Sequence, residues 1–159
     1  MLAMAGKLPS ALVVFEADIR EVGVEAAALR LTAGLAGVEA DAYREFLVGQ
    51  VEALAIDVAA VTRRLAAVLG LEVGKAATLL EAHGSRPLTG GGRDVLSHLY
   101  DIAIVLARAA AIIGLGEALA WVRSEHSWLG GAPLEVLSSP GGAQRVFGLL
   151  ESLEDGNYL

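Results

Sequence analysis

Three histidines, His83, His98 and His126, are the side chains of this 159-residue chain best suited to metal binding or proton transfer. None lies three or four residues from another, the spacing that places two ligands on one helical face, and no HExxH motif occurs. The chain has no cysteine, which excludes disulfides, thiolate zinc sites and cysteine nucleophiles. We therefore expect no metal site and no bound cofactor.

The glycine-rich segments do not complete a nucleotide-binding motif. The GGGR sequence at 90–93 could present backbone amides to an anion, but the lysine and hydroxyl of a P-loop are missing. The GLG sequence at 114–116 follows a helical pattern rather than a strand, so it fails as a dinucleotide fingerprint. No GxSxG nucleophile elbow occurs either. We predict that the protein is not an enzyme.

Composition and net charge exclude several further classes of protein. The chain is 55% hydrophobic and 19% charged, which excludes a disordered tail, and its net charge of −7 excludes a general phosphate-binding field. The first apolar run, 11–15, is shorter than a signal-peptide core. The longest apolar stretch, 95–122, contains Asp101, Arg108 and Glu117, so we predict no membrane span and expect a soluble, cytoplasmic protein.

Hydrophobic periodicity predicts an all-helical fold. Residues 1–38 are interpreted as an N-terminal extension with one Ala- and Leu-rich helix over 24–35. The next helix is expected to begin with Asp41 as its N-cap and to continue its apolar stripe to Leu54. No strand pair or internal repeat competes with this interpretation.

Two short helices follow with the shape of a helix-turn-helix. Asp57 is placed to cap the first, Gly70 ends it, and the second spans 75–82. A loop over 85–92 (SRPLTGGG) then leads into a long helix over 93–113.

The helix at 93–113 has almost no polar face and must be covered on all sides. Two alternatives follow. Either the helix provides a self-association surface, which would give a homodimer or a larger oligomer, or the N-terminal extension wraps around it. After a glycine break at 114–116 we expect a helix over 117–124, an irregular stretch over 126–137 and a last helix capped by Ser139.

Residues 120–159 resemble the toxin-binding domain of the Xre/MbcA/ParS antitoxin family. That family pattern has a helix ending in Trp-Leu, an LGG loop before Pro-Leu-Glu, a Thr-Pro-x-Gly-Ala helix start and a Gly-x-Tyr close. Here Glu125-His126-Ser127-Trp128 replaces the Pro-Asn-Pro-like turn of many members. The matching segments are Ala120-Trp121-Val122, Leu129-Gly130-Gly131, Pro133-Leu134-Glu135-Val136-Leu137, Ser139-Pro140-Gly141-Gly142-Ala143 and Gly156-Asn157-Tyr158.

The resemblance implies an antitoxin of a type II toxin–antitoxin system whose partner is a RES-like or ParT-like, NAD-consuming toxin. In this family the C-terminal domain covers the NAD pocket of the toxin, and the end of the chain reaches into the mouth of that pocket. The implied organisation is an extension over 1–38, an Xre-like helix-turn-helix and dimerisation region over 39–115 and a toxin-binding domain over 116–159. The alternative is a DNA-binding transcriptional regulator with a C-terminal partner-binding module.

We assign toxin contact to the glycine-containing loop and to the tail. Acidic tail residues would pair with cations of a phosphate-binding pocket, while Tyr158 occupies a site for a flat ring and Leu159 provides apolar contact. Trp128 is either a hot spot for a partner or a lid on the local core. The assigned residues are Trp128, Leu129, Gly130, Gly131, Glu154, Asp155, Gly156, Asn157, Tyr158 and Leu159.

Operator DNA is a further partner that the resemblance implies. The helix-turn-helix region offers few groups that read bases or bind phosphates, which is a weak set for an acidic protein. The candidates are Arg63, Arg64, Lys75, Thr78 and Arg86.

Overall fold

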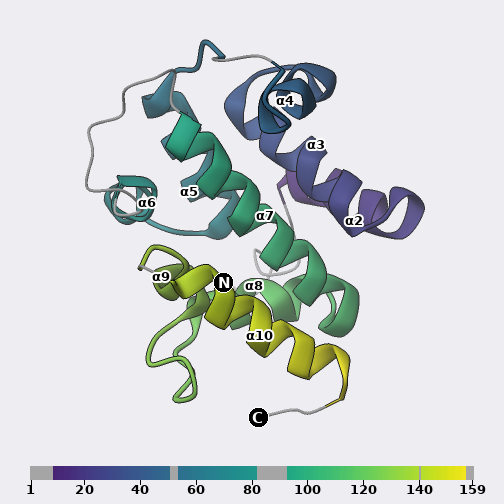
Figure 1. Cartoon of the computed structure of the whole chain (residues 1–159), viewed down its shortest axis with the longest axis vertical. Helices are drawn as coiled ribbons and strands as arrows, with labels where there is room; N and C mark the ends of the chain where they lie inside the picture. The colour runs from purple at the N-terminus through teal and green to yellow at the C-terminus, as the bar shows by residue number, and fades with distance from the viewer. Residues whose placement is uncertain (1–8, 51–53, 82–92, 140, 157–159) are drawn as a thin grey trace.

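The computed structural model describes residues 9–50, 54–81, 93–139 and 141–156, and within these residues the fold is all-helical, as predicted (Figure 1). The only β-type pairing in this part of the chain is an isolated bridge between His126 and Gly131. The helices are α2 (Ser10–Val22), α3 (Val24–Ala36), α4 (Ala40–Leu47), α5 (Val58–Leu69), α6 (Val73–Glu81), α7 (Arg93–Ile113), α8 (Leu115–Arg123), α9 (Pro133–Leu137) and α10 (Gly142–Glu154).

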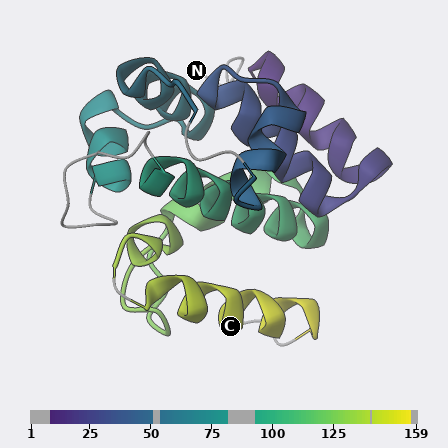
Figure 2. The ribbon, with the colours of Figure 1, turned by 45° about the horizontal axis from the view of Figure 1, so that its top comes forward.

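Helix α7 has the predicted bounds and forms the centre of the core. It lies between α3 on one side and α10 on the other, and it also packs against α8 and α2 (Figure 2). Leu12 and Phe15 of α2 belong to the same buried cluster as Leu99 and Leu106 of α7. The N-terminal helices therefore cover part of α7 within one chain, as the second alternative predicts, and self-association through α7 stays a prediction.

By length and composition alone, one helix in the described part of the chain, Val95–Ile113, could cross a membrane. Its apolar side chains are instead largely buried against the other helices of the fold, including Val95, Leu96 and Val105. The same composition is expected of the central helix of a helical bundle.

Helix α4 is shorter than predicted, and its N-cap is Glu39 rather than Asp41. The helix ends because Gly49 adopts a left-handed conformation (φ 85°), which lets the amide of Gln50 donate to the carbonyl of Glu45. The stripe therefore does not continue to Leu54. Tyr43 anchors this helix: it is fully buried, its hydroxyl donates to the carbonyl of Leu96 in α7, and burial raises its pKa above the ordinary value.

The two helices of the predicted helix-turn-helix are present. Asp57 caps α5, since its Oδ1 accepts from the amide of Ala60 at 3.3 Å, and Gly70 ends it with φ 69°. Helix α6 begins at Val73, two residues earlier than expected. The expected loop at 85–92 lies outside the described residues.

Three details of the C-terminal part differ from the sequence predictions. Helix α8 begins directly after Gly114 and includes Gly116, and the stretch predicted as irregular contains α9. Ser139 does not cap the last helix: its hydroxyl donates to the carbonyl of Val136 at 2.7 Å, and Gly141 takes the N-cap position with φ 70°. Both the N-cap of α10 and the reversal of the chain before this helix thus depend on Gly141.

Candidate functional site

The loop between α8 and α9 is organised around the backbone of His126. The amides of Leu129 and Gly130 both donate to the carbonyl of His126 at 2.9 Å, and its own amide donates to the carbonyl of Gly131 at 3.1 Å. The imidazole packs against the ring of Trp121, with 5.3 Å between ring centroids, and its Nε2 lies 3.2 Å from the carbonyl oxygen of that residue. A short, internally bonded turn results.

This turn places two neighbouring apolar side chains in opposite environments. Leu129 is 3% exposed and belongs to the core, and its carbonyl accepts from Arg145 of α10 at 3.3 Å. Trp128 is 59% exposed. Trp128 therefore does not cover the local core, and Leu129 does so instead. A large exposed aromatic ring on a fixed turn has the properties of a partner-binding anchor.

One of the acidic residues at the C-terminal end of α10, Glu154, forms an ion pair within the chain. Both carboxylate oxygens of Glu154 accept from Arg108 of α7, at 2.8 and 3.1 Å. The guanidinium also lies over the ring of Phe147, 5.6 Å from its centroid, and the hydrogen bond to Glu154 raises the pKa of Arg108. By contrast, Glu151 and Asp155 are exposed and form no salt bridge in the described part of the chain.

Replacing Glu154 with glutamine is expected to lower the free energy of unfolding by about 0.5–1 kcal/mol, because it removes a bidentate but partly exposed ion pair that fastens α10 to α7. Glu151→Gln is the matched control on the same helix and should change stability less. Urea unfolding of the two variants measures the difference, and equal effects would contradict a specific role for the Arg108–Glu154 pair.

The predicted toxin-binding residues of the loop, 128–131, do not lie close to those at the end of α10, Glu154 and Asp155. Arg145 holds the Trp128 turn beside the first turn of α10, whereas Glu154 and Asp155 lie at the other end of that helix (Figure 1). Arg145 and Glu154 are nine positions apart in this helix, which corresponds to roughly 14 Å along its axis. Gly156 follows the helix with φ 86°. The remaining predicted residues, Asn157, Tyr158 and Leu159, lie outside the described residues.

Most of the predicted DNA-binding side chains make contacts within the chain. Arg64 donates to the carbonyl of Leu35 at 2.9 Å, and Thr78 donates to the carbonyl of Gly74 at 3.0 Å. The ammonium of Lys75 lies 3.8 Å from Glu135, at the start of α9. Arg63 is exposed and has no such contact in the described part of the chain. Arg86 lies outside it, so contact with DNA stays a prediction.

His98, a sequence candidate for metal binding or proton transfer, lies in the core and takes part in contacts between helices. His98 is completely buried in α7, with Nε2 3.3 Å from the hydroxyl of Ser138, which itself donates to the carbonyl of Leu79 in α6. Among the described residues, no group of three or more histidine, cysteine, aspartate or glutamate side chains could hold a metal ion. His98 thus lies where α6, α7 and α9 meet.

The C-terminal helices resemble a known protein family. Residues 108–156 match the family described as the antitoxin Xre/MbcA/ParS C-terminal toxin-binding domain. This part of the chain is thus similar to Xre/MbcA/ParS toxin-binding domains. No curated protein and no solved structure matches the chain.

The matched Xre/MbcA/ParS segment begins inside α7 at Arg108 and ends just after α10. It therefore includes both members of the Arg108–Glu154 pair and the entire Trp128 turn. Sequence reasoning missed the roles of Arg108, His126 and Arg145, which hold the domain together. Only the departure of residues 125–128 from the family pattern marked this turn as unusual.

Proposed function

We propose that this protein is a non-catalytic, cytoplasmic antitoxin that neutralises a RES-like or ParT-like, NAD-consuming toxin by occluding its NAD pocket. The match of residues 108–156 to a toxin-binding domain carries the antitoxin part of this proposal. The exposed Trp128, presented on a fixed turn within that domain, supports direct contact with the toxin.

The proposed contact has two parts, one at each end of α10. At the first, the indole of Trp128 enters an apolar socket on the toxin. At the second, Glu151 and Asp155 face the cations that a pocket for a pyrophosphate must carry, and the tail with Tyr158 and Leu159 enters the pocket. Because Glu154 is paired with Arg108, we expect it to contribute mainly to holding α10 in place.

The family resemblance also implies that the protein represses its own operon by binding operator DNA through α5 and α6. Support for this autorepression is weak, since the chain is acidic and Arg64 and Lys75 already contact Leu35 and Glu135. Any operator binding would rest on Arg63 and on Arg86, and would be strongly dependent on salt.

Deletion of residues 155–159 is expected to leave folding intact and to weaken neutralisation of a co-expressed RES-like or ParT-like toxin, because the acidic tail and its aromatic ring are removed. Growth of the co-expressing cells and co-purification of the two proteins measure the effect. The matched control is Asp41→Asn, which removes one exposed carboxylate far along the chain, in α4.

Unchanged inhibition by the truncated chain would contradict the tail-occlusion mechanism while leaving the antitoxin role in place. Failure of the unchanged 159-residue chain to bind or neutralise toxins of this kind would overturn the proposed function itself.

A further inference from the structure

An open groove of about 620 Å³ crosses α7, between the corner of α2 and α3 on one side and the C-terminal end of α10 on the other. Val22, the last residue of α2, and Glu25, in the first turn of α3, line the first side, and Glu154 lines the second. Ile104 and Arg108 of α7 form the floor. Figure 2 shows α7 between α3 and α10, with the α2–α3 corner and the end of α10 toward the same side of the molecule.

The two sides of this groove belong to different parts of the chain. Arg108 and Glu154 lie within the segment 108–156 that matches the toxin-binding domain, whereas Val22 and Glu25 lie far outside it. The groove therefore follows the boundary between the matched segment and the N-terminal helices. A protein that covers the acidic end of α10 comes within reach of the α2–α3 corner, because residues of both line the same groove.

The α2–α3 corner is held in a fixed shape by Gly23. With φ 97°, this glycine is both the C-cap of α2 and the N-cap of α3. Its amide donates to the carbonyl of Asp18 at 3.2 Å, and its carbonyl accepts from the amide of Ala27 at 3.0 Å. The corner presents Val22 with 43% of its surface exposed. An exposed apolar side chain on a fixed backbone is suited to contact with a partner.

The charges around the groove are mainly negative. Glu154 neutralises Arg108 at 2.8 Å, whereas Glu25 and Glu151 are exposed and form no salt bridge in the described part of the chain. Glu151 lies close to the groove floor, because its charge, after the hydrogen bond to Glu154, also raises the pKa of Arg108. Arg20 of α2 lines a different hollow, beside the start of α8. The groove thus combines apolar side chains with unpaired carboxylates.

We propose that the toxin bound by the matched segment also contacts the N-terminal helices, by placing an arginine or lysine side chain in this groove. The aliphatic stem of such a side chain packs against Val22 and Ile104, and its cation reaches Glu25 and Glu151. A toxin with a pocket for a pyrophosphate carries cations near that pocket. The inference rests on the proposed antitoxin function, and it extends the interface to helices outside the matched segment.

Calorimetry with the purified toxin that the unchanged chain neutralises in co-expression tests the proposal. Val22→Arg should weaken binding by about tenfold or more, because it places a second cation where the cation of the toxin lies. Val22→Glu should bind within about threefold of the unchanged chain, since a carboxylate at the same position attracts that cation. Circular dichroism and thermal unfolding verify that the variants fold.

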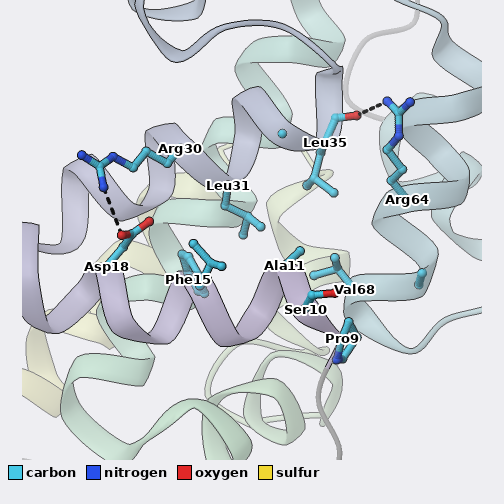
Figure 3. A pocket seen from close by; sticks show the side chains of 13 residues that line it. Pro9, Ser10, Ala11, Phe15, Asp18, Arg30, Leu31, Leu35, Arg64 and Val68 are labelled. Carbon is cyan, nitrogen blue, oxygen red and sulfur yellow. Dashed lines mark hydrogen bonds and ion pairs between the residues drawn. The ribbon is translucent and has the colours of Figure 1, made fainter.

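Val14→Arg is the matched control, because it makes the same substitution at an exposed valine of the same helix. Val14 is 59% exposed and lines a different groove of about 480 Å³, between α2, α3 and α5 (Figure 3). No residue of the matched segment 108–156 lines that groove. We therefore expect Val14→Arg to bind the toxin as the unchanged chain does.

The salt dependence of binding is a second measurement, which a merely structural role of the corner would not change. Glu25→Gln should reduce the dependence of the affinity on ionic strength, because one ion pair across the interface is lost. Glu45→Gln is the matched control, since it removes an exposed carboxylate of α4 that does not line the groove, and it should leave the salt dependence unchanged.

Three results would overturn the inference while leaving the antitoxin role in place. These are binding by Val22→Arg within about threefold of the unchanged chain, equal losses for Val22→Arg and Val22→Glu, and an equal loss for Val14→Arg. If residues 157–159 of the same chain filled the groove, Val22→Arg would lower the melting temperature of the free chain, and deletion of those residues would abolish this effect. That result would also overturn the inference. Failure of the unchanged chain to bind the toxin would overturn both proposals.

Discussion

Replacing Trp128 with alanine is expected to weaken binding of the cognate toxin about 30-fold or more, while the fold is unchanged. An exposed tryptophan that anchors an interface typically contributes about 2 kcal/mol or more, and each 1.4 kcal/mol corresponds to a factor of ten in affinity. The side chain is 59% exposed, so its removal leaves no cavity in the core. Calorimetry with the purified toxin measures the affinity, and thermal unfolding measures stability.

Two variants separate a specific contact from a general loss of apolar surface. Trp128→Phe should retain part of the affinity, because a smaller aromatic ring still fills some of the socket. Val73→Ala removes exposed apolar surface from the first residue of α6, outside the matched domain, and should bind as the unchanged chain does. A Trp128→Ala variant that binds within threefold of the unchanged chain would remove Trp128 from the proposed interface.

The parts of the fold that the sequence predicted well are those set by local signals. Helix α7 has the predicted bounds, and Asp57 and Gly70 cap and end α5 as expected. Each of these features depends on residues within one or two turns of the chain: an apolar run, a carboxylate within reach of a free amide, or a glycine that adopts a left-handed conformation.

The parts that the sequence did not predict depend on contacts between distant residues. Glu154 appeared available to a partner because its cation, Arg108, lies 46 residues earlier in the chain. The sequence could not decide whether Trp128 contacts a partner or covers the local core. The hydrogen bonds of His126 decide this, because they hold the turn so that Leu129 points inward and Trp128 points outward. In the extension over 1–38 the sequence predicted the helix over 24–35, which is α3, but it did not predict α2 or that both helices pack against α7.

Gly142→Ala is expected to destabilise the protein by about 2–4 kcal/mol, a loss in melting temperature of roughly 6–12 °C for a chain of this size. A Cβ at this position would overlap the carbonyl oxygen of Val136 and lie 2.8 Å from the hydroxyl oxygen of Ser139. The obstacle is the backbone at the end of α9, so the junction of α9 with α10 must open to admit a methyl group. Thermal and urea unfolding measure the loss.

Gly148→Ala is the matched control on the same helix, and it should have the opposite sign. A Cβ at Gly148 meets no atom within 4 Å outside its own helical turn, so alanine should stabilise α10 by about 0.5–1 kcal/mol through its higher helix propensity. Neither glycine has a positive φ, so the two variants differ in the space available to the methyl group and not in backbone strain. A Gly142→Ala variant as stable as the unchanged chain would refute this steric requirement for glycine at position 142.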